Sequence, residues 1–106
     1  QVVPQDYAGT WRVDIDGRWK GEWELTVDEA DRIAGTFISD ELQNRYEILG
    51  QLGSAPHHVK LSITLANAQM QVEGYLWTKD KSRIAGTANM VGRKFGFVAQ
   101  RVVETP

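Results

Sequence analysis

The sequence predicts an all-β protein whose eight antiparallel strands form a closed up-and-down barrel. Apolar and polar residues alternate with a period of two along nearly the whole chain, which is typical of strands with one buried face. Turn-forming residues interrupt this alternation every 8–14 residues or so, as in a small all-β domain. The connections are short, so consecutive strands should be antiparallel neighbours. Closing the meander removes the two unpaired edges that an open sheet would leave.

The first half of the chain contains four such strands, which we expect at 7–16, 19–28, 32–39 and 44–52. The pair Asp16-Gly17 suits a tight hairpin between the first two strands, and polar residues provide the next two connections. The apolar residues that recur at alternate positions in these strands are Trp11, Val13, Ile15, Trp23, Leu25, Ile33, Phe37, Tyr46 and Ile48.

The second half contains four more strands, which we expect at 58–66, 69–79, 83–91 and 94–102. Breakers at Gly53 to Pro56 precede them, and Gly92-Arg93 reads as a short turn between the last two. Their alternating apolar residues are Val59, Leu61, Ile63, Leu65, Met70, Val72, Leu76, Ile84, Met90, Phe95 and Phe97.

Length and composition indicate one globular domain. The chain has 106 residues, of which 42% are hydrophobic and 25% charged, so residues 1–106 should form a single barrel domain with an ordered core of about 7–103. We expect Gln1 to Asp6 and Glu104 to Pro106 to be flexible ends. Such ends fit a complete chain and a piece of a longer protein equally well.

Charge and residue usage exclude several kinds of partner. The formal net charge is -2, so no basic excess is available to neutralise the phosphates of a nucleic acid. There is no cysteine, which excludes disulfides, thiolate metal sites and a cysteine nucleophile. No apolar run approaches the roughly 20 residues of a membrane span. We therefore expect a soluble protein with neither nucleic acid nor membrane as partner; its compartment stays open, and an exported mature chain fits.

The predicted interior is almost wholly apolar and large enough to fill an eight-stranded barrel. Only Ser39 and the Tyr46 hydroxyl offer inward polar atoms, so any residual pocket should be small, apolar and located at one mouth. Five glycines also lie on the inward phase, where we interpret them as allowing bends and close approach of neighbouring backbones; they are Gly21, Gly35, Gly50, Gly74 and Gly86.

No arrangement of residues predicts catalysis, a metal site or a cofactor. His57 and His58 are adjacent beside Pro56. A metal site usually needs three or four convergent ligands, and adjacent strand residues point apart, so we interpret the two histidines as a solvated loop pair. Carboxylates gather on the outer face of the first hairpin, where they are typical of a solubilising surface; a weak calcium site is the alternative. The chain is therefore not expected to be an enzyme. These carboxylates are Asp14, Asp16, Glu22, Glu24 and Asp28.

Apolar residues on the outward phase predict a protein contact. Tyr75 and Trp77 are two positions apart on one expected strand, so they share an outer face, and exposed aromatic surface often marks an interface. Incidental exposure of scattered side chains is the alternative. The candidate interface residues are Ile38, Leu49, Tyr75, Trp77 and Val98, with Val91 also on the outward phase.

Short motifs resemble the avidin and streptavidin group within the calycin barrels. Gly9-Thr10-Trp11 resembles the Gly-x-Trp of the first calycin strand, and Arg101 resembles the arginine that packs across that tryptophan and closes the barrel. The stretch from Gly35 to Pro56 is similar to the third and fourth streptavidin strands, through Gly35-Thr36-Phe37, Ser39, Arg45-Tyr46, Gly50 and Ser54-Ala55-Pro56. The resemblance implies the barrel fold.

The same resemblance does not imply biotin binding. Ser39 matches a serine that binds the ureido group, but Phe37 lacks the hydroxyl of the family's tyrosine and Val13 replaces its asparagine. The last strand offers no aspartate, and several lid and anchor positions are apolar; they fall near Met70, Val72 and Ala88. Losing several partners at about 1–3 kcal/mol each would remove tight binding.

Two functions remain open. The full interior favours a non-catalytic interaction or accessory module that self-associates or docks a protein partner through its outer patch. The alternative is a protein that binds a small apolar ligand at one barrel mouth. The candidate ligand-binding residues for that alternative are Trp11, Trp23, Phe37, Ser39 and Tyr46.

Overall fold

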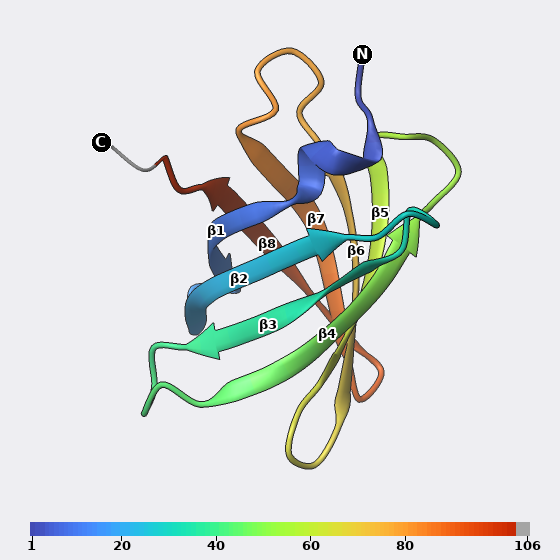
Figure 1. Cartoon of the computed structure of the whole chain (residues 1–106). Helices are drawn as coiled ribbons and strands as arrows, with labels where there is room; N and C mark the ends of the chain where they lie inside the picture. The colour runs from blue at the N-terminus through green and yellow to red at the C-terminus, as the bar shows by residue number, and fades with distance from the viewer. Residues whose placement is uncertain (104–106) are drawn as a thin grey trace.

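Eight antiparallel strands form a closed barrel in chain order (Figure 1). The computed structural model describes residues 1–103. Within this part of the chain the fold prediction is confirmed, because every strand pairs with its sequence neighbours and β1 pairs with β8. The strands are β1 (Gly9–Ile15), β2 (Trp19–Val27), β3 (Ile33–Ser39), β4 (Arg45–Leu52), β5 (His58–Thr64), β6 (Gln69–Leu76), β7 (Arg83–Met90) and β8 (Arg93–Arg101).

The register of β1 fixes how the barrel closes. Trp11 lies opposite Trp23 of β2 on one side and Arg101 of β8 on the other. Every observed strand boundary lies within two residues of the expected one, except the end of β6. β6 ends at Leu76, so Trp77 follows the strand, and the last hairpin turns through Val91 and Gly92 rather than Gly92-Arg93.

The N-terminal segment is a part of the packed structure, which corrects two expectations. Residues expected to be a flexible end form a 3-10 helix, η1 (Pro4–Tyr7), and Val2 before it is buried. Tyr7, expected to begin the first strand, ends this helix instead and is fully buried. Burial of two apolar side chains provides the reason, because each gains a favourable free energy only when the segment folds onto the barrel. Glu104 to Pro106 lie outside the described residues.

The core fills the barrel but thins toward one end. Most of the expected inward residues are buried, and they form one continuous cluster. The exceptions are only partly buried and pack against that cluster; they are Tyr46, Leu65, Met90 and Phe95. The close approach expected at the five inward glycines is confirmed, because a methyl group at each would overlap atoms of a neighbouring strand; the bends expected there stay a prediction.

Candidate functional site

The two ends of the barrel are built differently. One end, here called the open end, carries the connections 16–18, 40–44, 65–68 and 91–92. The other, the closed end, carries η1 and the connections 28–32, 53–57 and 77–82. Three of the open-end loops project at the bottom of Figure 1, whereas η1 lies near the top. Any site inside the lumen must therefore be approached from the open end.

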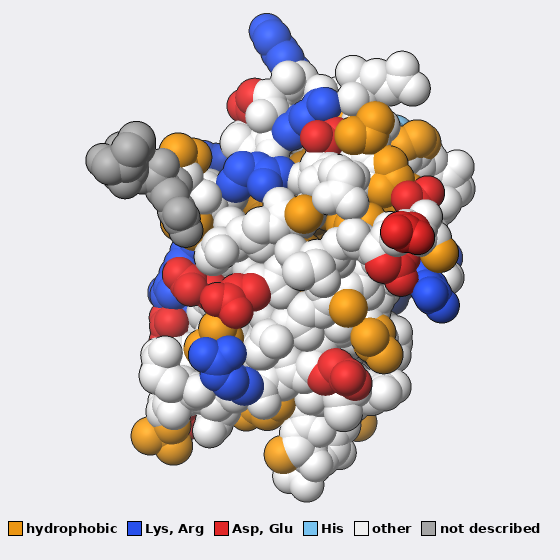
Figure 2. Space-filling model, in the orientation of Figure 1, with side chains coloured by type: hydrophobic (Ala, Val, Ile, Leu, Met, Phe, Trp, Pro, Cys, Tyr) orange, Lys and Arg blue, Asp and Glu red, His pale blue; other side chains and the backbone are white. Residues whose placement is uncertain are grey.

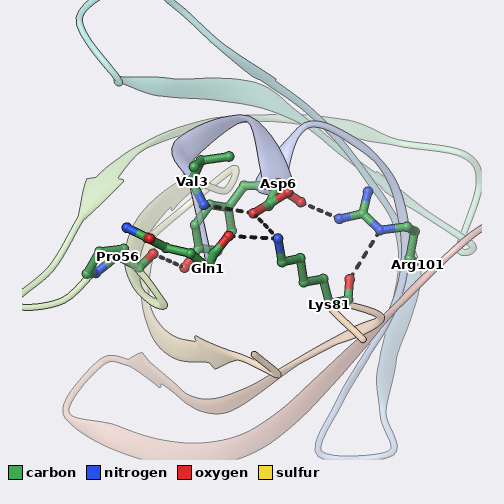
Figure 3. A network of polar contacts seen from close by, with 7 residues as sticks. Gln1, Val3, Asp6, Pro56, Lys81 and Arg101 are labelled. Atoms are coloured by element: carbon green, nitrogen blue, oxygen red, sulfur yellow. Dashed lines mark hydrogen bonds and ion pairs between the residues drawn. The ribbon is translucent and has the colours of Figure 1, made fainter. Parts of the chain in front are cut away.

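Arg101 ties together the segments of the closed end (Figure 3). Its guanidinium lies 4.2 Å from the centre of the Trp11 ring, a cation–π arrangement. It donates hydrogen bonds to the carbonyl oxygens of Ala8 at 3.0 Å, Lys81 at 3.3 Å and Asp6. One side chain therefore joins β8, the N-terminal segment and the β6–β7 connection.

η1 is held by a second set of contacts. The Tyr7 hydroxyl donates to the Pro56 carbonyl at 2.9 Å, and the Trp11 indole donates to the Tyr7 carbonyl at 2.9 Å. Asp6 accepts from the Val3 N–H and pairs with Lys81 at 3.0 Å. Burial opposes ionisation of Asp6, but the Val3 N–H and the Lys81 ammonium outweigh it and lower the pKa of this carboxyl. These contacts seal the end against ligand entry.

The open end contains a cavity of about 310 Å³. Its apolar lining includes the buried Phe37 and Met70 and the partly buried Leu65 and Met90. The volume lies at the lower end of the range of small-molecule sites, about 300–1,000 Å³. The remaining lining residues are Trp19, Ser39, Glu41, Asn44, Tyr46, Ala66, Asn67 and Ala68.

Polar groups form the rim of this cavity. The side-chain amides of Asn44 and Asn67 and the hydroxyl of Tyr46 make no hydrogen bond to any described residue. Ser39 Oγ accepts from the Glu41 N–H at 3.2 Å, which leaves its own O–H free to donate. Glu41 is the one charged residue of the lining. An apolar floor below a mostly neutral polar rim suits a small amphiphile.

The structure brings together three of the five predicted ligand-binding residues. Phe37, Ser39 and Tyr46 line the cavity, and the rings of Phe37 and Tyr46 lie 6.0 Å apart. Trp11 and Trp23 are fully buried and do not line it. Trp11 belongs to the closed end. Trp23 packs on Phe97, and its indole N–H reaches no acceptor among the described residues.

Sequence reasoning missed the lining contributed by connections. Glu41 and Asn44 were treated as part of a polar connector and Asn67 as a breaker, whereas Leu65 was expected on an inward strand position. The signal that could have found them is the topology itself. In an up-and-down barrel, alternate connections lie at the same end, so 40–44 and 65–68 must border the same mouth.

The candidate interface residues do not form one patch. Tyr75 lies opposite Ala85, which lies opposite Val98, so these three residues form a row across β6, β7 and β8. Trp77 follows β6, and the Arg83 guanidinium lies over its ring, 5.3 Å from the ring centre. Leu49 lies on β4 opposite Ala34 and Ser62, and the partly buried Ile38 lies on β3. The aromatic pair and Val98 are therefore separated from the other two candidates.

The expectation of a solvated histidine pair is wrong for His58. This residue belongs to β5 and is 5% exposed, with its ring stacked on Tyr75 at 4.7 Å. The Ser54 N–H donates to Nδ1 at 3.1 Å, so the neutral ring carries its proton on Nε2, which lies 3.1 Å from Glu73. The β4–β5 connection folds over the ring because Gly53 has no side chain to obstruct it. His58 thus fastens this loop.

Two further observations concern possible metal binding and similarity to known proteins. Within residues 1–103, no three His, Asp or Glu side chains are close enough to hold a metal ion. No helix in the described part of the chain is long and apolar enough to cross a membrane. No protein-family model and no curated protein matches the sequence. The resemblance to avidins therefore stays a prediction.

Proposed function

We propose that this protein is a non-catalytic binding module that takes a small, neutral amphiphile into the open end of its barrel. The cavity lined by Phe37, Met70 and Met90 carries this proposal, because it is the place where predicted ligand-binding residues and unfilled apolar volume coincide. The ligand's apolar body would contact this floor. Its hydroxyl or amide would exchange hydrogen bonds with the rim groups of Ser39, Asn44 and Asn67.

The charge of the rim determines which amphiphile should bind best. Glu41 is the charged residue of the lining, so a carboxylate ligand would meet a like charge and a neutral ligand would not. We expect a medium-chain alcohol to bind more tightly than the carboxylate of the same chain length. Glu41→Gln should reduce the difference between the two ligands.

Trp19 lines the cavity and provides the measurement. Titration with decanol should change its fluorescence, and Trp19→Phe should remove most of the change, whereas Trp77→Phe should not.

A second variant tests the cavity itself. Ala68→Phe places a ring in the cavity and should weaken decanol binding by about tenfold or more, because the ligand loses buried volume. The matched control is Ala30→Phe, on an exposed connection at the closed end. Equal binding by both phenylalanine variants would contradict the proposal.

A second candidate function is a protein contact through the row of Tyr75, Ala85 and Val98, with Trp77 beside it. Tyr75 and Trp77 are each 49% exposed, and three of these side chains lie on adjacent strands. Aromatic residues on a continuous face are typical of interfaces. Sedimentation velocity of the parent and of Trp77→Asp tests self-association. If the parent protein is a monomer at every concentration, this surface does not mediate self-association.

A further inference from the structure

Three of the four open-end connections carry exposed apolar residues, whereas the fourth, 16–18, has the sequence Asp-Gly-Arg. Leu42 of the 40–44 connection is 84% exposed, and Val91 of the β7–β8 turn is 81% exposed. The 65–68 connection between them has no charged residue and exposes Ala66. Figure 2 has hydrophobic side chains along its lower edge, where these loops project in Figure 1. The tips therefore present apolar groups in one direction.

Leu42 and Val91 occupy positions where their backbone conformation is unfavourable. Leu42 has φ 59° and Val91 has φ 52°, in the left-handed region that glycine and asparagine adopt most readily. Gly92 follows with φ 76°, so the β7–β8 turn has two positive φ values, for which Asn-Gly is the preferred pair. Local stability alone would favour asparagine at Val91. An aliphatic side chain there indicates a use for its apolar surface.

The closed end provides the contrast. Its connection 28–31 contains three carboxylates, and its connection 79–81 has the sequence Lys-Asp-Lys. Both ends of the barrel contact water in the same way, so solubility alone would favour charged tips at both. The closed end also exposes apolar groups, at Val3, Trp77 and Val103, but its turn residues with positive φ are the charged Asp31 and Lys81. Aliphatic residues at such turn positions, Leu42 and Val91, therefore mark a surface that is covered when the protein functions.

The charged side chains around the apolar tips indicate which kind of surface covers the open end. Arg45 and Arg93 begin β4 and β8 beside the apolar tips, and neither forms an ion pair with a described residue, nor does Lys94. Their strand partners Ile38, Met90 and Asn89 are uncharged. Asp16 and Asp40 at this end are already paired with Arg18 and Arg12, whereas Asp14, Glu41 and Glu47 are carboxylates near this end without an ion pair to a described residue. A chain of net charge -2 thus has unpaired cations around its apolar tips.

We propose that the open end docks on an anionic lipid surface, with Leu42 and Val91 inserted among the lipids and Arg45, Arg93 and Lys94 against the headgroups. Exposed apolar side chains next to basic ones are the combination that binds such interfaces. A second copy docked end to end would instead bring the same cations toward each other. The expectation of no membrane partner rested on spanning segments, which this mode of binding does not need.

Cosedimentation with vesicles tests the docking. The parent protein should bind vesicles of phosphatidylcholine that contain phosphatidylglycerol and should bind pure phosphatidylcholine far less. The double variant Leu42→Asn/Val91→Asn should lose about tenfold or more of this binding. Asparagine tolerates positive φ, so this variant should unfold in urea at the same concentration as the parent or higher. A urea midpoint equal to or above that of the parent would exclude misfolding as the cause of the loss.

The closed end offers a matched control. Val3 and Val103 are exposed aliphatic residues there, and Val3→Asn/Val103→Asn should bind vesicles like the parent. Arg45→Gln/Arg93→Gln should lose the preference for phosphatidylglycerol. The proposal is wrong if anionic vesicles do not bind the parent, or if both asparagine double variants bind equally. A dimer that Leu42→Asn/Val91→Asn dissociates, without vesicle binding, would assign the surface to a second copy instead.

The docking proposal does not rest on the proposed ligand. Ala68→Phe should bind vesicles like the parent while it loses decanol binding, because the tips remain exposed when the cavity is filled. Leu42→Asn/Val91→Asn should retain decanol binding, since neither residue lines the cavity. The two proposals can therefore fail separately.

Discussion

At the scale of single residues, the closed end depends on side chains that join segments distant in the chain. Arg101 bonds three carbonyl groups and covers Trp11, so its planar guanidinium satisfies backbone acceptors that no strand partner reaches. A lysine could supply the charge but not several donors in fixed directions. The closed end of the barrel therefore depends on hydrogen bonds to backbone carbonyl groups as well as on apolar packing.

Two glycines provide a residue-scale prediction about close packing of strands. A methyl group at Gly35 would overlap the Glu24 carbonyl of β2, whereas one at Gly96 would meet nothing within 4 Å. We expect Gly35→Ala to lower the free energy of unfolding by about 2 kcal/mol or more, because the neighbouring backbone must move. Gly96→Ala is the matched control and should leave stability unchanged or slightly raised. Urea titrations of both variants give the comparison; equal midpoints would contradict the packing argument.

Individual side chains also mark where sequence reasoning reached its limit. The alternation correctly placed Phe37, Ser39 and Tyr46 on the inward phase near one mouth. The neighbouring Pro56 led to the interpretation of His57 and His58 as a solvated loop pair, although the expected strand 58–66 begins at His58. Burial of His58 depends on that loop folding back over the ring, which is a tertiary contact that no period of the sequence records.

At the scale of elements, the strands were predictable and η1 was not. Alternation over seven to nine residues fixes both the type and the inward face of a strand. The four residues of η1 are too few to show a periodic pattern. Tyr7 also lies an even number of residues before Trp11 and Val13, so the strand-like alternation of apolar residues extends back to it. The 3-10 helix forms because Tyr7 packs into the barrel end, which depends on the closed structure.

The contribution of η1 can be measured at Tyr7. Its ring is fully buried and its hydroxyl bonds the Pro56 carbonyl, so the two parts can be removed separately. Tyr7→Phe should cost about 1 kcal/mol of unfolding free energy through the lost hydrogen bond. Tyr7→Ala should cost about 3–5 kcal/mol, because it leaves a large cavity. Denaturation by guanidinium compares them. Equal stability of Tyr7→Ala and the parent would show that η1 does not hold the closed end.

At the scale of the whole molecule, the barrel separates a sealed end from an end that retains unfilled volume. The barrel can close around any set of apolar side chains of suitable total volume. Whether a cavity remains then depends on how far along the barrel axis these side chains fill the interior. The sequence predicted a filled interior, with any residual pocket small, apolar and at one mouth. The structure has a cavity at the open end, where Leu65 and Met90 are only partly buried. Its polar rim comes from loops, whose conformations alternation does not specify.

The distribution of carboxylates over the molecule predicts how stability depends on pH. Hydrogen bonds and cations lower the pKa values of Asp6 in η1 and of Asp28, Asp40 and Asp80, which lie in three different connections between strands. A carboxyl with a lowered folded-state pKa contributes stability that is complete above the unfolded value, near 3.8. That contribution is lost as the pH falls through the folded-state pKa. The urea midpoint should therefore be steady near neutral pH and fall as the pH drops from about 5 to about 2.

Asp6→Asn isolates one part of this loss. The asparagine cannot pair with Lys81, so we expect this variant to be less stable than the parent at neutral pH. We also expect the gap between the two proteins to narrow as the pH falls, because the parent's carboxyl becomes protonated there while the variant has none at this position. Glu29→Gln is the control, since the Glu29 side chain bonds to no group within residues 1–103 and is exposed. A gap between parent and Asp6→Asn that stays constant down to the lowest pH would mean that the carboxylate does not stabilise the closed end.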